Sequence, residues 1–216
     1  MSNDELTSHV TDELFWDPKV DNAAIAVSAD DGVVTLGGTV GSLRQKREAK
    51  KDAERVWGVK SVNNDLQVRL LNDDRREDAD LRGAVLQALR LDSQIPATVD
   101  ADVDDGMVTL KGQANWHFQR DEAETVAINV VGVVSVDNAI ELVPPSPGAE
   151  DLENSIEKAM KRSAKLDAES VSVESSNGTV TLRGTVSSWA DHDEAVSAAW
   201  AAPGVTRVKD HILVAY

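Results

Sequence analysis

The chain has 216 residues, of which 41% are hydrophobic and 28% charged, a balance typical of a globular protein. It contains no cysteine, which excludes disulfides, thiolate metal sites and cysteine nucleophiles and suits a reducing compartment. The formal net charge of −16 argues against nucleic-acid binding, because neutralising phosphates requires lysine and arginine.

Apolar residues spaced four apart predict a helix at the start of the chain and two more at equivalent places further on. The three sets are Leu6, Val10 and Leu14; Leu81, Val85 and Leu89; and Ile156, Met160 and Ala164. Each set forms a stripe that buries one helix face. We expect these helices to end near Asp17, Asp92 and Asp167.

A hairpin motif follows each predicted helix. The pattern Gly-x-Val-Thr-Leu-x-Gly begins at Gly32, Gly106 and Gly178, at intervals of 74 and 72 residues. The residues before these glycines are Asp31, Asp105 and Asn177. Asp-Gly and Asn-Gly predict a two-residue type I′ turn, in which both central residues have positive φ. The glycines are therefore assigned to backbone geometry rather than to a phosphate-binding loop.

A second helix and a last strand complete each repeat. Ser42, Asn115 and Ser188 are the expected N-caps, and Gly58, Gly132 and Gly204 the expected left-handed C-terminal caps. Each of these last glycines opens a motif Gly-Val-x-x-Val-x-Asn/Asp-x-Leu/Ile that leads into the strand. Asn64, Asn138 and Asp210 stand where an inward apolar residue is expected. Either a bulge in the strand or a side-chain hydrogen bond to a neighbouring loop would explain a polar residue at this position.

The predicted fold class is α+β, with three tandem α-β-β-α-β modules, each a three-stranded mixed sheet packed against two helices. The expected boundaries are residues 1–71 for module 1, 72–143 for module 2 and 150–216 for module 3. Residues 144–149 form a Pro-rich linker between the last two modules. Three strands and two helices bury only a modest core.

The paired glycine motifs and the α-β-β-α-β order resemble the BON domain, the bacterial domain named for osmotic-shock and nodulation proteins. The resemblance covers nearly the whole chain in three copies. It implies no catalytic residues and no cofactor. Members of the family are mostly secreted or envelope proteins, some of which bind anionic phospholipid or act in osmotic stress, and one relative binds potassium.

Two sets of residues are candidates for binding. Arg44, Arg47, Lys51 and Arg55 fall on one face of the second helix of module 1 and form a basic stripe, defined here by these four residues. This stripe suits binding to anionic headgroups or to an acidic partner. The alternative is a solvated helix face without a ligand, on which Glu48, Asp52 and Glu54 screen the positive charges. Trp116 and Trp189 suit an interface with a partner or lipid, or alternatively packing within the domain.

Metal ligation and catalysis find no support in the sequence. The four histidines, His9, His117, His192 and His211, show no metal-ligand spacing. The aspartate run from Asp100 fails as a calcium loop, because its sixth residue is Asp105 rather than glycine and its twelfth is Lys111. The run is better explained by a hairpin strand in which aspartates on the solvent-exposed face alternate with buried apolar residues.

We therefore expect a non-enzymatic binding or adaptor protein linked to osmotic or envelope stress. The alternatives are binding of anionic phospholipid through the basic helix and sensing of a monovalent cation such as potassium. Expected partners are a protein or a phospholipid surface, with a homo-oligomer as a further option and no nucleic acid. Residues 1–10 lack the features of a secretory signal, and no apolar run is long enough to cross a membrane. The expected location is cytoplasmic, or periplasmic if a leader was removed.

Overall fold

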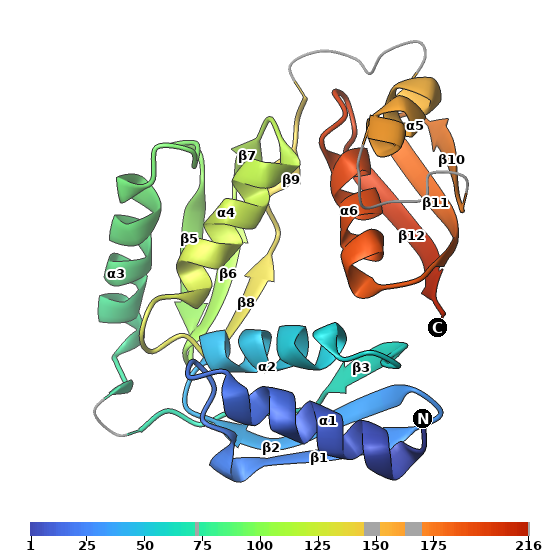
Figure 1. The fold of residues 1–216 in the computed structure, drawn as a ribbon. Coiled ribbons are helices and arrows are strands. Elements are labelled where there is room, and N and C mark those ends of the chain that lie inside the picture. Colours follow the sequence, from blue (N-terminus) through green and yellow to red (C-terminus); the bar gives the residue numbers. More distant parts are fainter. Residues whose placement is uncertain (72–73, 145–151, 163–169, 216) are drawn as a thin grey trace. The chain divides into compact units, whose positions relative to one another are not determined.

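The computed structural model describes residues 1–71, 74–144, 152–162 and 170–215 (Figure 1). Module 1 consists of α1 (Asn3–Trp16), β1 (Ile25–Asp30), β2 (Val33–Val40), α2 (Leu43–Arg55), β3 (Ser61–Asn64) and β4 (Gln67–Val68). A 3-10 turn at Asn22–Ala24 precedes β1. β1 is antiparallel to β2, and β3 and β4 are both parallel to β2. The sheet is therefore mixed, as predicted.

Module 2 repeats this order with shorter hairpin strands. It comprises α3 (Asp78–Leu91), β5 (Asp100–Asp104), β6 (Met107–Lys111), β7 (Gln113–Ala114), α4 (His117–Ile128), β8 (Ser135–Asn138) and β9 (Glu141–Leu142). β5 is antiparallel to β6, whereas β8 is parallel to it. β7 pairs with β9 beyond the glycine that interrupts the hairpin strand.

Module 3 consists of α5 (Leu152–Arg162), β10 (Val171–Ser176), β11 (Thr179–Val186), α6 (Trp189–Trp200) and β12 (Arg207–Val214). β10 is antiparallel to β11, and β12 runs parallel to β11 without a break. Figure 1 shows both helices lying against one side of this sheet. The α+β class with three mixed sheets, each covered by two helices, is thus confirmed.

The cores follow the predicted stripes. Leu6, Val10 and Leu14 of α1 are at most 3% exposed and pack with Val34 and Leu36 of β2. The equivalent residues of module 2 (Leu81, Val85 and Leu89) and of module 3 (Ile156 and Met160) are buried in the same way. Ala164 and Asp167 lie outside the described residues. The alanines of the second helices, Ala49, Ala53, Ala123, Ala127, Ala195 and Ala199, are fully buried, because a methyl group lets each helix approach its sheet closely.

The hairpin turns have the predicted conformation. Asp31 and Gly32 have φ of 46° and 85°, and the turns at Asp105-Gly106 and Asn177-Gly178 match them closely. Asp17 and Asp92 are the C-caps of α1 and α3, and Ser42 and Ser188 are the N-caps of α2 and α6, as expected.

Two details of the expected caps are wrong. α4 begins at His117, and the side chain of Gln119 instead accepts from the backbone N–H groups of Asn115 and Trp116, at 3.0 and 3.2 Å. Gly58 has a left-handed φ of 94°, but α2 already ends at Arg55 with Val56 as its C-cap. Gly58, like Gly132 and Gly204, therefore shapes the turn that follows the helix.

The asparagine that breaks the parity of the last strand bonds to the second helix. Asn64 Nδ2 donates to the carbonyl oxygen of Lys46 at 2.8 Å, and Asn138 Nδ2 donates to that of Arg120 at 2.8 Å. In both modules the strand is interrupted immediately after this asparagine. The side-chain bond is thus the correct alternative, although its acceptor is in a helix rather than in a loop.

Each sheet has a face that the helices of its own module leave uncovered, and these open faces differ in charge. Module 1 presents small residues such as Ser28 and Thr35 there. Module 2 presents exposed acidic residues, namely Asp100, Asp102, Asp104 and Asp137, together with Lys111. Module 3 presents the exposed residues Arg183, Arg207, Lys209 and His211, together with Glu174.

Candidate binding surface

The second helix of module 1, α2, is positioned by a short apolar face. Ser42 Oγ accepts a hydrogen bond from Gln45 N at 3.3 Å and starts the helix. Ala49, Asp52 and Ala53 are buried against the sheet and α1. Since residues three and four apart share a helix face, these three residues lie on one face of α2, and Arg44, Lys50 and Lys51 elsewhere on the helix are exposed.

The structure divides the predicted basic stripe into two parts. Arg44 and Lys51 are exposed, and the Nζ of Lys51 lies 3.9 Å from Glu48 Oε1. Arg47 is half-buried and its Nη1 donates to Thr125 Oγ1 at 3.1 Å. Arg55 makes two ion pairs within module 1. The solvated part of the stripe that remains for an external ligand therefore centres on Arg44 and Lys51.

Arg55 ties α2 to α1. Its Nη2 lies 3.0 Å from Glu13 Oε1 and 2.5 Å from Asp52 Oδ1. Asp52 is 0% exposed, and its Oδ2 has no hydrogen-bond partner. Burial raises the pKa of Asp52 from 3.8 to about 6, even though Arg55 lowers it. Asp52 was expected to screen the stripe as part of a solvated face; its side chain is instead buried, where it pairs with Arg55.

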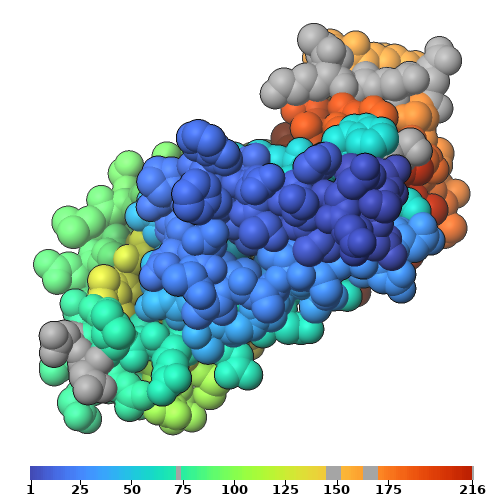
Figure 2. Space-filling view, turned by 60° about the horizontal axis from the view of Figure 1, so that its bottom comes forward, coloured from blue at the N-terminus to red at the C-terminus, as the bar shows by residue number. Residues whose placement is uncertain are grey.

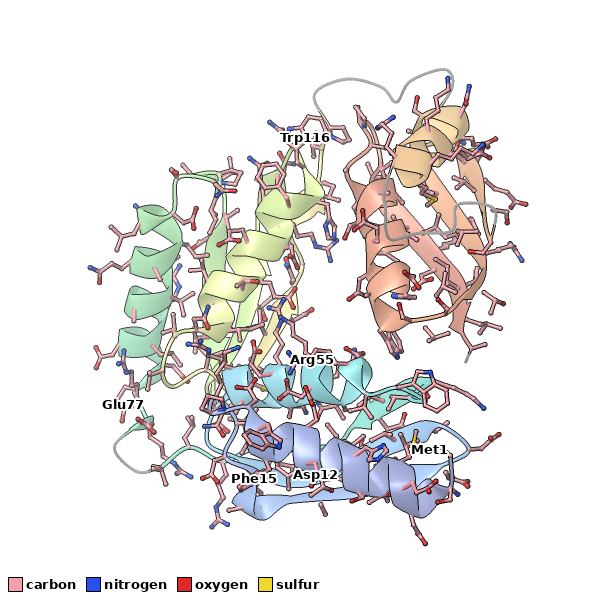
Figure 3. All side chains as sticks on the ribbon, in the orientation of Figure 1. Met1, Asp12, Phe15, Arg55, Glu77 and Trp116 are labelled. Atoms are coloured by element: carbon pink, nitrogen blue, oxygen red, sulfur yellow. The ribbon has the colours of Figure 1, made fainter. Side chains whose placement is uncertain are left out.

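Two aromatic side chains of α1, the helix that packs on α2, are exposed. Phe15 and Trp16, at the end of α1, are 71% and 78% exposed, and their rings meet edge to face at 6.3 Å between centroids. Figure 3 labels Phe15 at the end of α1, and Figure 2 shows α1 in dark blue on the surface of module 1. Neither residue was predicted to be a site from the sequence, although both fall outside the buried stripe of Leu6, Val10 and Leu14.

The two tryptophans proposed as interface residues are less exposed. Trp189 is partly buried, packs against the core of module 3, and its ring meets that of His192 at 4.8 Å. Trp116 is half-buried at the start of α4. Packing within the module accounts for the position of Trp189, and an interface role for either residue stays a prediction.

The residues that the structure describes include neither a metal-binding cluster nor a membrane-spanning helix. In those ranges, no group of three or more histidine, aspartate or glutamate side chains has a geometry that could hold a metal ion. No helix described in the structure has the length and hydrophobicity to cross a membrane. The aspartates of β5 are exposed on the open face of their sheet, as the alternation indicated.

The fold and the paired glycine motifs agree with a family model, described as BON domain, that matches three times, at residues 2–69, 77–144 and 149–216. The chain belongs to the BON domain family. Escherichia coli (strain K12) has a similar protein, named "Osmotically-inducible protein Y". It is 34% identical over 143 residues, which cover 64% of this chain and 71% of the relative.

Solved structures show only weak similarity to this BON protein. CdsD, described as a structural protein of the type III secretion system of Chlamydia trachomatis, matches at 14% identity with a TM-score of 0.27, over 98% of this chain and 92% of that chain. The PrgH periplasmic domain matches at 12% identity with a TM-score of 0.24, over 95% and 99% of the two chains. Similarity at this level carries no information on function.

The basic residues at these positions of the second helix are particular to BON module 1. The positions of Arg44, Arg47 and Lys51 are taken by Phe118, Asp121 and Thr125 in α4 and by Ala190, Asp193 and Ser197 in α6. The shared fold therefore does not require basic residues there. Residues 1–71 carry 9 basic and 12 acidic side chains, against 6 and 15 in residues 72–149, so module 1 is also much the less acidic of the two.

Proposed function

We propose that this chain is a non-catalytic binding protein of the osmotic-stress response, and that the helices of module 1 form its contact surface for an anionic phospholipid bilayer. The association with osmotic stress comes from the relative named osmotically inducible, with which it shares the BON domain. The observation that carries the lipid assignment is the pairing of exposed cations on α2 with exposed aromatic rings on α1.

The chemistry of these side chains suits a membrane interface. Lysine and arginine near an anionic leaflet each contribute about 1 kcal/mol. Tryptophan and phenylalanine add apolar area, and the indole N–H can remain hydrated at the level of the headgroups. Since the whole chain carries −16, attraction to the bilayer must be local and strongly weakened by salt.

Vesicle co-sedimentation tests this proposal. The chain is mixed at low salt with phosphatidylglycerol–phosphatidylcholine vesicles and, in parallel, with phosphatidylcholine vesicles alone. We expect binding only to the anionic vesicles. The double variant Arg44→Glu and Lys51→Glu should bind at least about tenfold more weakly, because it reverses two charges at the surface. Phe15→Ala with Trp16→Ala should also weaken binding, since it removes exposed apolar area.

The open face of module 3 provides the matched control. Arg183→Glu with Lys209→Glu changes the net charge of the chain by the same amount, at exposed positions far from α1 and α2 in the sequence. We expect this variant to bind almost as the native chain does. Equal losses in the two double variants would show that binding follows net charge, and absence of binding at low salt would remove the lipid assignment.

A further inference from the structure

The side-chain hydrogen bond that joins the last strand to the second helix is made by different groups in module 3. In modules 1 and 2 an asparagine donates its side-chain N–H to a helix carbonyl 18 residues earlier. Module 3 has Asp210 at this position, and an ionised carboxylate has no N–H to donate. The partner 18 residues earlier is His192, whose Nε2 lies 2.7 Å from Asp210 Oδ2. A side chain has replaced the helix backbone as the partner.

His192 contacts carboxylates through both of its ring nitrogens. Nδ1 lies 3.1 Å from Asp193 Oδ1, while Nε2 faces Asp210. The side chain of His192 is only 13% exposed. Asp210 is itself held in place, because its Oδ1 accepts from Ile212 N at 3.0 Å. One imidazole thus faces two carboxylates, of which that of Asp210 is held by the backbone of its own strand.

This arrangement suits the protonated ring. A histidinium has two N–H donors and can satisfy both carboxylates, whereas neutral imidazole has one N–H and turns a lone pair toward the other carboxylate. The hydrogen bond with Asp193 and, beyond it, that with Asp210 hold the pKa of His192 above its usual 6.5, although burial opposes them.

Four charged or titratable groups on α6, β11 and β12 are directed elsewhere. On α6, Asp191 is turned to the hydroxyl groups of Ser187 and Ser188, at 2.8 Å from each. On β12, Lys209 and His211 point to the open face of the sheet, away from α6. Arg183 of β11 lies on that open face as well.

We propose that His192 and Asp210 form a proton-operated latch in module 3. The protonated histidine holds α6 on β12, and loss of its proton loosens this contact, while the asparagine bonds of modules 1 and 2 do not respond to pH. A group whose pKa rises on folding stabilises the fold fully below its unfolded value. The contribution of the latch is therefore complete below about pH 6.5 and is lost as the pH rises through the pKa of folded His192.

Hydrogen exchange of the whole chain tests the latch, with module 2 as the internal reference. We expect the protection factors of α6 amides to fall by about tenfold as the pH rises through the His192 titration, relative to those of α4, because one hydrogen bond to a charged group is lost. Protection factors are the proper readout, since they correct for the intrinsic pH dependence of exchange. An NMR titration of the His192 ring locates the interval independently.

The other modules supply the matched variants. His192→Arg places a permanent cation where module 2 has Arg120, and it should keep α6 protected at all pH values. Asp210→Asn restores the residue of modules 1 and 2, and should lower the pKa of His192 and flatten the profile. A flat profile in the native chain, or a fall of equal size in the His192→Arg variant, would overturn the proposal.

Discussion

Two adjacent glycines in β2 have different roles, and only one of them is constrained by the fold. Gly38 has a φ of +110°, and a Cβ there would overlap the carbonyl oxygen of Ala24. A Cβ on Gly37 would meet nothing within 4 Å. The repeats already mark the difference, because Gly38 aligns with Gly112 and Gly184, whereas Gly37 aligns with Lys111 and Arg183.

Replacing each glycine by alanine separates these roles. We expect Gly38→Ala to lower the free energy of unfolding of module 1 by on the order of 2 kcal/mol, because it forces alanine into a glycine conformation against a neighbouring backbone. Gly37→Ala should stay within about 0.5 kcal/mol of the native chain. Hydrogen exchange of module 1 amides measures both values. Equal effects would contradict the assigned close contact.

At the scale of elements, sequence periodicity predicted the helices and hairpins well, because each depends on local signals: apolar stripes, capping serines and Asp-Gly turns. It predicted the basic stripe less well. Whether Arg55 faces a ligand or Glu13 depends on how α1 packs on α2, which periodicity in α2 does not contain. The sequence did indicate that Asp52 faces inward, because the residues at the equivalent positions of the other modules are the apolar Val126 and Ala198.

Buried Asp52 gives the α1–α2 contact a predictable pH dependence. Its pKa rises on folding from 3.8 to about 6, so ionisation costs the folded state stability as the pH rises between these values, and the cost persists above them. Asp52→Val, which copies module 2, should raise the free energy of unfolding of module 1 at pH 7 by about 2 kcal/mol. Arg55 keeps Glu13 as a partner in this variant.

Hydrogen exchange at pH 7 and at pH 4 distinguishes this electrostatic cost from a general packing effect. The gain in free energy of unfolding from Asp52→Val should shrink toward pH 4. At that pH, Asp52 of the native chain is protonated in the folded state and partly protonated in the unfolded state. A gain of the same size at both pH values would assign it to packing, and a loss at pH 7 would show that the pair with Arg55 is stabilising.

At the scale of the whole molecule, the repeat is what made the architecture predictable. Two independent motifs kept the same intervals, so each repeat had to fold in the same way. The buried residues of module 1 and those of module 3 form separate hydrophobic clusters, each drawn from one module. The chemistry of ligand recognition was less predictable, since it depends on the exposed positions at which the copies differ.

Separate cores imply separate responses to mutation. Ile156 of α5 is 0% exposed, and Ile156→Ala should cost module 3 about 3 kcal/mol, because it leaves a cavity in the core. In the full chain, we expect hydrogen-exchange protection to fall in β10, β11 and α6 and to remain unchanged in β1, β2 and α2. A comparable fall in module 1 would show that the modules unfold as one cooperative unit.

The open faces of the three sheets show how three copies of one module can carry different surface chemistries. The strands that carry small residues in module 1 carry aspartates in module 2 and mostly cations in module 3, while most of the inward positions stay apolar. Residues on these faces contribute little to folding, so each copy is free to acquire its own chemistry. A single scaffold can in this way display neutral, acidic and basic surfaces side by side in the sequence, and grafting one face onto another module would exchange surface chemistry without redesigning a core.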